Sequence, residues 1–113
     1  MRILAIETSC DDTSIALVEV VSNLRSCRPA CRQAGVLRLE VKVLKNIVSS
    51  QTEIHAHFGG VVPNLAKRAH EKNLPEIFSN LKPLTFNLKP ELIAVTVGPG
   101  LEPALWAGIE FAK

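Results

Sequence analysis

The sequence lacks any apolar run that could cross a membrane, and its first residues do not form a secretory signal. A transmembrane helix needs about 20 consecutive apolar residues, whereas polar or charged residues interrupt every apolar run of these 113 residues well before that length. The N-terminus also shows no succession of basic, apolar and small residues. We therefore expect a cytoplasmic protein without a membrane partner.

Cysteine is scarce as well, since the chain has only 3. An odd number without an export signal predicts free thiols rather than a disulfide framework. Cys27 and Cys31 are four residues apart and Cys10 is distant in sequence, so the paired spacing typical of a zinc site is missing. A zinc site built on these cysteines is therefore disfavoured.

Net charge is low, at +2, and by itself gives no argument for binding nucleic acid. The basic residues are nevertheless unevenly placed, because one stretch has four arginines with no acid between them: Arg25, Arg28, Arg32 and Arg38. These arginines either contact RNA phosphates or belong to a solvated insertion, and the lack of any periodicity favours the insertion. The length and the 47% hydrophobic content are compatible with one small domain that has a real core.

What the chain does contain, close to its start, is an acidic, hydroxyl-rich turn between two apolar segments. The apolar run up to Ile6 predicts a strand over residues 2–7, and the next run predicts an antiparallel neighbour over residues 14–21. The carboxylates, hydroxyls and backbone amides of such a turn can hold a phosphate and its metal ion. The competing interpretation is an ordinary hairpin turn whose Asp and Ser side chains bond their own backbone.

Periodicity, proline and glycine predict the remaining elements. They are a loop over 22–38, a half-exposed strand over 39–48, a polar connection over 51–62, a helix from Pro63 that is kinked or broken at Pro75, a loop over 83–90, a buried strand over 92–97, and a helix over 104–113. The apolar residues of the last helix continue to its end without a capping glycine, which predicts a chain truncated within that helix. The order of elements predicts an α/β layer sandwich.

Three separated segments together resemble one known family. They are Ile3-Leu-Ala-Ile-Glu-Thr-Ser-Cys-Asp-Asp-Thr13, the stretch from Asn46 through Gly59-Gly-Val-Val-Pro63 to His70, and Ala94-Val-Thr-Val-Gly-Pro-Gly-Leu101. The family they resemble is TsaD, the tRNA adenosine threonylcarbamoyltransferases. The resemblance covers nearly the whole chain except residues 22–38, and its middle segment is the most specific because a generic fold gives no reason for it.

The resemblance implies an actin-like, or ASKHA (sugar kinase and heat-shock ATPase-like), fold in which residues 1–113 form an incomplete N-terminal lobe. It implies transfer of a threonylcarbamoyl group from threonylcarbamoyl-AMP to the adenosine next to the anticodon of tRNAs that read codons beginning with adenine. It also implies a divalent metal, iron or zinc, and TsaB-like and TsaE-like partner proteins. On this resemblance the residues present here would be active only with the rest of the protein.

Two alternatives belong to other classes of protein. The chain could be a non-catalytic lobe that acts as the interaction partner of a full-length homologue. It could also be a sugar or acetate kinase of the same superfamily, although the middle segment argues against this. A protease is disfavoured, because no Ser, His and Asp and no paired zinc histidines are placed for one.

The resemblance also names candidate site residues in the two turns. The candidate catalytic residues are Glu7 and Asp11, which would hold a metal through water or orient the acceptor amine. The candidate nucleotide-binding residues are Ser9, Asp12, Thr13, Gly98 and Gly100. The family's metal-binding His-x-x-x-His pair would lie beyond Lys113, so we expect no metal ligands in this chain and expect surface or packing roles for His55, His57 and His70.

Overall fold

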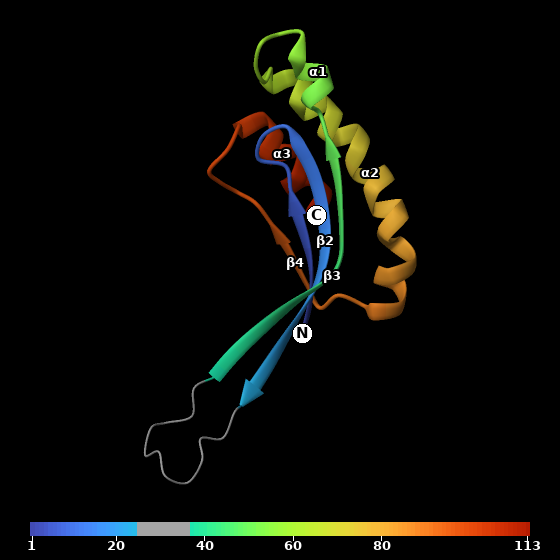
Figure 1. The fold of residues 1–113 in the computed structure, drawn as a ribbon. Helices are drawn as coiled ribbons and strands as arrows, with labels where there is room; N and C mark the ends of the chain where they lie inside the picture. Colours follow the sequence, from blue (N-terminus) through green and yellow to red (C-terminus); the bar gives the residue numbers. More distant parts are fainter. Residues whose placement is uncertain (25–36) are drawn as a thin grey trace.

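The computed structural model describes residues 1–24 and 37–113, which form a mixed four-stranded sheet whose helices pack on one face (Figure 1). The order of strands across the sheet is β3-β2-β1-β4. The elements in chain order are β1 (Arg2–Glu7), β2 (Asp12–Leu24), β3 (Leu37–Ser50), α1 (Thr52–Ala56), α2 (Pro63–Leu88), β4 (Leu92–Val95) and α3 (Glu102–Ala112). An α/β architecture is thereby confirmed.

The first two strands form the predicted hairpin around the acidic turn. β1 and β2 pair antiparallel from Arg2 opposite Glu19 to Glu7 opposite Ser14. On its other side β1 pairs with β4, and this pairing is parallel. Because parallel strands end at the same edge of a sheet, the segments that follow β1 and β4 start side by side.

The core lies between one face of the sheet and the helices. Alternation along β1 and β2 turns every second side chain toward the helices, and α2 supplies a stripe at three- and four-residue spacing. The buried residues of this cluster are Leu4, Ile6, Ile15, Leu17, Leu74, Ile77 and Leu81. Burying each of these side chains contributes about 1.5–3 kcal/mol, so packing rather than helix propensity holds α2 in place.

Helix α2 corrects two expectations, since Pro75 does not break it and the predicted loop over residues 83–90 is mostly helical. Both Pro75 and Pro83 are exposed, so the carbonyl groups that lose a helical partner can reach water. The buried stripe continues past both prolines, and its packing outweighs their cost. The helix ends at Leu88, and the left-handed Lys89 (φ 44°) closes it by donating its amide to the Thr85 carbonyl at 2.8 Å.

The β2–β3 hairpin is longer than the sequence predicted, because residues 22–24 and 37–38 of the expected loop belong to its strands. The predicted insertion between them, with Arg25, Arg28 and Arg32, lies outside the described residues. Leu44 faces no partner on β2, which is a bulge in the ladder. Beyond that bulge the hairpin extends away from the helices (Figure 1). The apolar side chains there, Leu39, Val41 and Val43, are exposed.

Two smaller expectations are also corrected. The predicted polar connection over residues 51–62 contains the short helix α1. The predicted buried strand over residues 92–97 is the four-residue β4, whose Leu92 and Ile93 are about half exposed, at 50% and 55%. β4 is an edge strand of the described sheet, so one side of it has no neighbour there. None of the described helices is long and apolar enough to cross a membrane.

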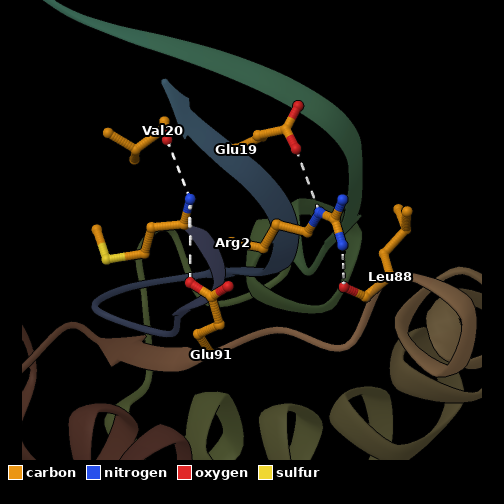
Figure 2. A network of polar contacts seen from close by, with 6 residues as sticks. Arg2, Glu19, Val20, Leu88 and Glu91 are labelled. Carbon is orange, nitrogen blue, oxygen red and sulfur yellow. Dashed lines mark hydrogen bonds and ion pairs between the residues drawn. The ribbon is translucent and has the colours of Figure 1, made fainter. Parts of the chain in front are cut away.

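A polar network closes the end of the sheet opposite the acidic turn (Figure 2). Arg2 bonds the Glu19 carboxylate through Nε at 3.2 Å and donates from Nη1 to the Leu88 carbonyl, the last of α2, at 2.6 Å. The N-terminal ammonium group donates to the Val20 carbonyl at 3.2 Å and lies 3.9 Å from the Glu91 carboxylate. One guanidinium group thus ties the start of β1 to both β2 and the end of α2.

We expect Arg2→Met to destabilise this end of the sheet by about 1–2 kcal/mol, because a charged donor to two acceptors is lost. The matched control is Lys67→Met, which removes an exposed pair with Glu71 at 3.8 Å and should cost no more than about 0.5 kcal/mol. Hydrogen exchange at the backbone amides of β1 and β4, compared between the two variants of the intact protein, measures how far each substitution destabilises this end of the sheet. Equal exchange in the two variants would contradict the role given to Arg2.

Candidate active site at the ends of β1 and β4

Two turns from distant parts of the chain meet at one edge of the sheet. The acidic turn (residues 7–13) follows β1, and the glycine turn (residues 98–101) follows β4. The Leu101 amide donates to the Ser9 carbonyl at 2.8 Å. A Cβ atom on Gly100 would lie 2.6 Å from the Ser9 carbonyl oxygen and 2.8 Å from its Cβ, so only glycine allows this approach.

Glu7 is the carboxylate that joins the two turns. Its Oε1 accepts the Ser9 amide at 2.6 Å, and its Oε2 accepts the hydroxyl of Thr96, which follows β4. Partial burial opposes ionisation, but the hydrogen bonds from Ser9 and Thr96 outweigh it, so the pKa of Glu7 lies below its usual value. Glu7 is therefore ionised, and each of its oxygens already accepts one hydrogen bond within the protein.

Asp11 is placed differently from Glu7. It is half-buried and lines a cavity of about 190 Å³ whose other walls come from α1 and the segment after it: Thr52, His55, Ala56, Gly60 and Val61. The neighbouring Cys10 is exposed and free, and a hydrogen bond with Asp11, then partial burial, raises the pKa of its thiol. Cys10 thus stays protonated, which makes it a weak nucleophile, while Asp11 has an open space beside it.

The other predicted nucleotide-binding residues occupy unlike positions. Asp12 is exposed at the first position of β2, Ser9 is half-buried, and a Cβ on Gly98 would meet nothing within 4 Å. Thr13, in contrast, is fully buried, and its hydroxyl lies 2.8 Å from His70 Nδ1. The structure therefore joins Ser9 directly, and Glu7 through Thr96, to the segment after β4. It places Asp11 beside α1, and Thr13 packs behind the acidic turn.

Comparison with known proteins now identifies the family. A family model described as tRNA N6-adenosine threonylcarbamoyltransferase, TsaD, matches residues 42–113. The chain belongs to the TsaD family. It is 43% identical to the tRNA N6-adenosine threonylcarbamoyltransferase of Thermosipho africanus, 46% to that of Fervidobacterium nodosum and 43% to that of Bartonella henselae, in each case over its whole length. It spans only 28–29% of the length of these TsaD relatives.

The sequence prediction missed one feature of this TsaD chain, a buried set of polar side chains behind the acidic turn. His70 is 0% exposed, His55 is 4% exposed and Gln51 is 0% exposed. A signal was present, because His70 lies four residues after Ala66 and four before Leu74 on the apolar face of α2. We expected a surface or packing role for His55 and His70, and the structure confirms packing.

The resemblance to the TsaD family places the family's metal ligands beyond Lys113. Across residues 1–24 and 37–113, no group of three or more His, Cys, Asp or Glu side chains is arranged to hold a metal ion. The described residues therefore do not fit the iron or zinc that the TsaD family resemblance implies.

Substituting Gly100 tests the contact between the two turns. We expect Gly100→Ala to destabilise the site by about 1–3 kcal/mol and to speed exchange of the Leu101 amide, because its methyl group would overlap Ser9. The control is Gly60→Ala, where a Cβ meets nothing within 4 Å and the change should stay within about 0.5 kcal/mol. Similar exchange in the two variants of the intact protein would show that the close approach is not needed.

The lowered pKa of Glu7 predicts a pH dependence of stability. The ionised carboxylate stabilises the fold above its unfolded pKa of about 4.3, and this stabilisation is lost as the pH falls through the lower pKa of the folded state. Glu7→Gln should therefore cost about 1–2 kcal/mol at pH 7 and progressively less below pH 4. Denaturant unfolding of both proteins across this range measures the difference, and a difference independent of pH would contradict the prediction.

Proposed function

We propose that the whole protein transfers a threonylcarbamoyl group from threonylcarbamoyl-AMP to N6 of the adenosine next to the anticodon of tRNAs that read codons beginning with adenine. The TsaD relatives are named for this reaction on tRNA adenosine N6. The observation that carries the proposal for this chain is the junction of the acidic and glycine turns. It lies at the carboxyl ends of parallel strands, where open α/β sheets bind their ligands.

The corresponding fold proposal is an ASKHA N-terminal lobe. The support is the strand order β3-β2-β1-β4, with an antiparallel hairpin on one side of β1 and a parallel strand on the other. In this fold the acidic turn faces the nucleotide between two lobes, so the remaining length of the protein would supply the opposite wall. The active enzyme is accordingly the whole protein.

The reaction needs a group that handles the proton of the acceptor amine. Attack by N6 forms a nitrogen–carbon bond to the carbamoyl carbon, the bond from that carbon to the phosphate oxygen breaks, AMP leaves, and N6 loses a proton. A carboxylate against the phosphate would repel it, whereas a carboxylate beside the amine accepts its hydrogen bond. An acid near the amine is therefore favoured over an acid near the phosphate.

Asp11 suits the amine better than Glu7 does. Both side chains line cavities, but each Glu7 oxygen already accepts a hydrogen bond from a donor that holds the two turns together, the Ser9 amide or the Thr96 hydroxyl. The Asp11 carboxylate accepts instead from the exposed Cys10 thiol, which a ligand can replace. We assign Asp11 to orient the acceptor amine and receive its proton, and Glu7 to hold the two turns in register. The Ser9 hydroxyl and the open Gly98 are the proposed contacts of the adenylate phosphate, and the exposed Asp12 is a proposed contact of the nucleotide away from that phosphate.

The cofactor and partners remain proposals for the whole protein. The described residues offer no set of metal ligands, so no step is assigned to iron or zinc, and we keep the prediction that the ligands follow Lys113. When bound, such a metal would supply a positive charge toward the substrate's oxygens. The proposed partners are tRNA and TsaB-like and TsaE-like proteins, in the cytoplasm.

The test is formation of threonylcarbamoyladenosine by the intact protein. Purified protein with its TsaB-like and TsaE-like partners is given threonylcarbamoyl-AMP and a tRNA with an adenosine beside its anticodon, and the digested nucleosides are measured by mass spectrometry. We expect Asp11→Asn to lower kcat by about 100-fold or more, because general-base assistance is lost. Glu76→Gln, on the exposed side of α2, is the control and should retain the wild-type rate.

Two outcomes would contradict the proposal at different levels. If wild-type protein forms no modified adenosine under these conditions, the proposed reaction is wrong. If the wild type is active and Asp11→Asn matches it, the reaction stands and the role of Asp11 is wrong.

A further inference from the structure

A chain of buried hydrogen bonds runs behind the acidic turn and links three parts of the fold. His70 from α2 lies 2.8 Å from the Thr13 hydroxyl through Nδ1 and 3.1 Å from the Cys10 carbonyl through Nε2. Gln51 lies between the two histidines, with Nε2 at 3.1 Å from His70 Nδ1 and Oε1 at 3.2 Å from His55 Nε2. The four side chains that take part are all buried: Thr13, Gln51, His55 and His70. This hydrogen-bond network is therefore part of the core rather than of the surface.

The partners of His70 determine where its proton resides. A carbonyl oxygen only accepts hydrogen bonds, so Nε2 of His70 carries the proton and donates to Cys10. Nδ1 of the neutral ring then accepts from the Thr13 hydroxyl. A second proton on Nδ1 would face the side-chain NH₂ group of Gln51, which is itself a donor. Burial also disfavours the charged ring and lowers the pKa of His70. The ring is therefore neutral, with a single defined tautomer.

The same logic assigns His55. Its Nε2 faces the Gln51 side-chain oxygen and so carries the proton, while its Nδ1 accepts the Val62 amide at 3.4 Å. This bond ties α1 to the residue before α2. Each donor in this network lies within hydrogen-bond distance of an acceptor, with the Thr13 hydroxyl and the Gln51 side-chain amide sharing His70 Nδ1. A buried polar network whose members are paired in this way adds rigidity.

One of these bonds, together with a backbone hydrogen bond, fixes the chain on either side of Asp11. The Cys10 carbonyl is held by His70 Nε2, and the Asp11 carbonyl is held by the backbone amide of Gln51 at 2.9 Å. With both carbonyl groups fixed, the peptide units before and after Asp11 have little freedom to rotate. They therefore fix where the Asp11 side chain leaves the backbone, and Asp11 lines the cavity beside α1.

We propose that His70 is a positioning residue, whose Nε2–H bond to the Cys10 carbonyl aims the Asp11 carboxylate into the cavity beside α1. The inference rests on the proposed function, since it gives the buried histidine a role through Asp11. His70 itself is fully buried and does not touch the substrate. A misdirected Asp11 would slow the chemical step while leaving tRNA binding by the rest of the protein unchanged.

Two substitutions separate this bond from simple packing. The amide of His70→Gln reaches the position of Nε2 and can still donate to the Cys10 carbonyl, whereas the shorter amide of His70→Asn reaches only the position of Nδ1. Both variants lose the imidazole ring, so both lose packing. We expect His70→Asn to lower kcat by about 10- to 100-fold with the KM for tRNA unchanged, and His70→Gln to stay within about threefold of the wild type.

Hydrogen exchange gives a readout that does not depend on activity. The backbone amide of Gln51 donates to the Asp11 carbonyl, so hydrogen exchange at this backbone amide in the intact protein reports directly on the acidic turn. We expect it to be about fivefold or more faster in His70→Asn than in His70→Gln. Equal exchange, or equal kcat losses in an active enzyme, would overturn the inference. An inactive wild type would defeat the proposed reaction, and exchange would still decide the role of His70.

Discussion

Parallel pairing of β4 with β1, from Ile3 opposite Leu92 to Ile6 opposite Val95, is the constraint on which the candidate site depends. It brings the glycine turn beside the acidic turn although most of the chain separates them. The side-chain bond from Thr96 to Glu7 and the amide bond from Leu101 to Ser9 then lock the junction. Without this pairing, the acidic turn would be only the end of a hairpin.

The acidic turn is held from two sides by different kinds of interaction. On the glycine-turn side, an ionised carboxylate and close backbone contact hold it through Glu7 and Gly100. On the α2 side, neutral buried groups hold its backbone through His70 and Gln51. Asp11 lies between these supports with a cavity beside it. A carboxylate held in this way is preoriented, so little reorganisation is needed when a ligand arrives.

Much of the fold could be predicted because its signals are local. Short apolar runs on either side of a polar turn predicted β1, β2 and their hairpin, alternation predicted most of β3, and three- and four-residue spacing predicted the start of α2. The errors arose where packing outweighed local preference. Pro75 and Pro83 normally end a helix, but Leu74, Ile77 and Leu81 bury the opposite side of α2 and keep it continuous. Strand pairing likewise extended β2 and β3 into a segment without clear periodicity.

By itself, the sequence determined the family, the acidic turn and the glycines of the second turn, because these depend on residue types at short spacing. Only the tertiary structure decided how the acidic residues divide their roles. Glu7 and Asp11 are both carboxylates in one turn, yet Glu7 bonds Ser9 and Thr96 and so joins the two turns, while Asp11 lies beside α1. The tertiary structure likewise decided that Thr13 and His70 form a buried, hydrogen-bonded pair. Their surroundings come from residues distant in sequence, and no local pattern encodes such contacts.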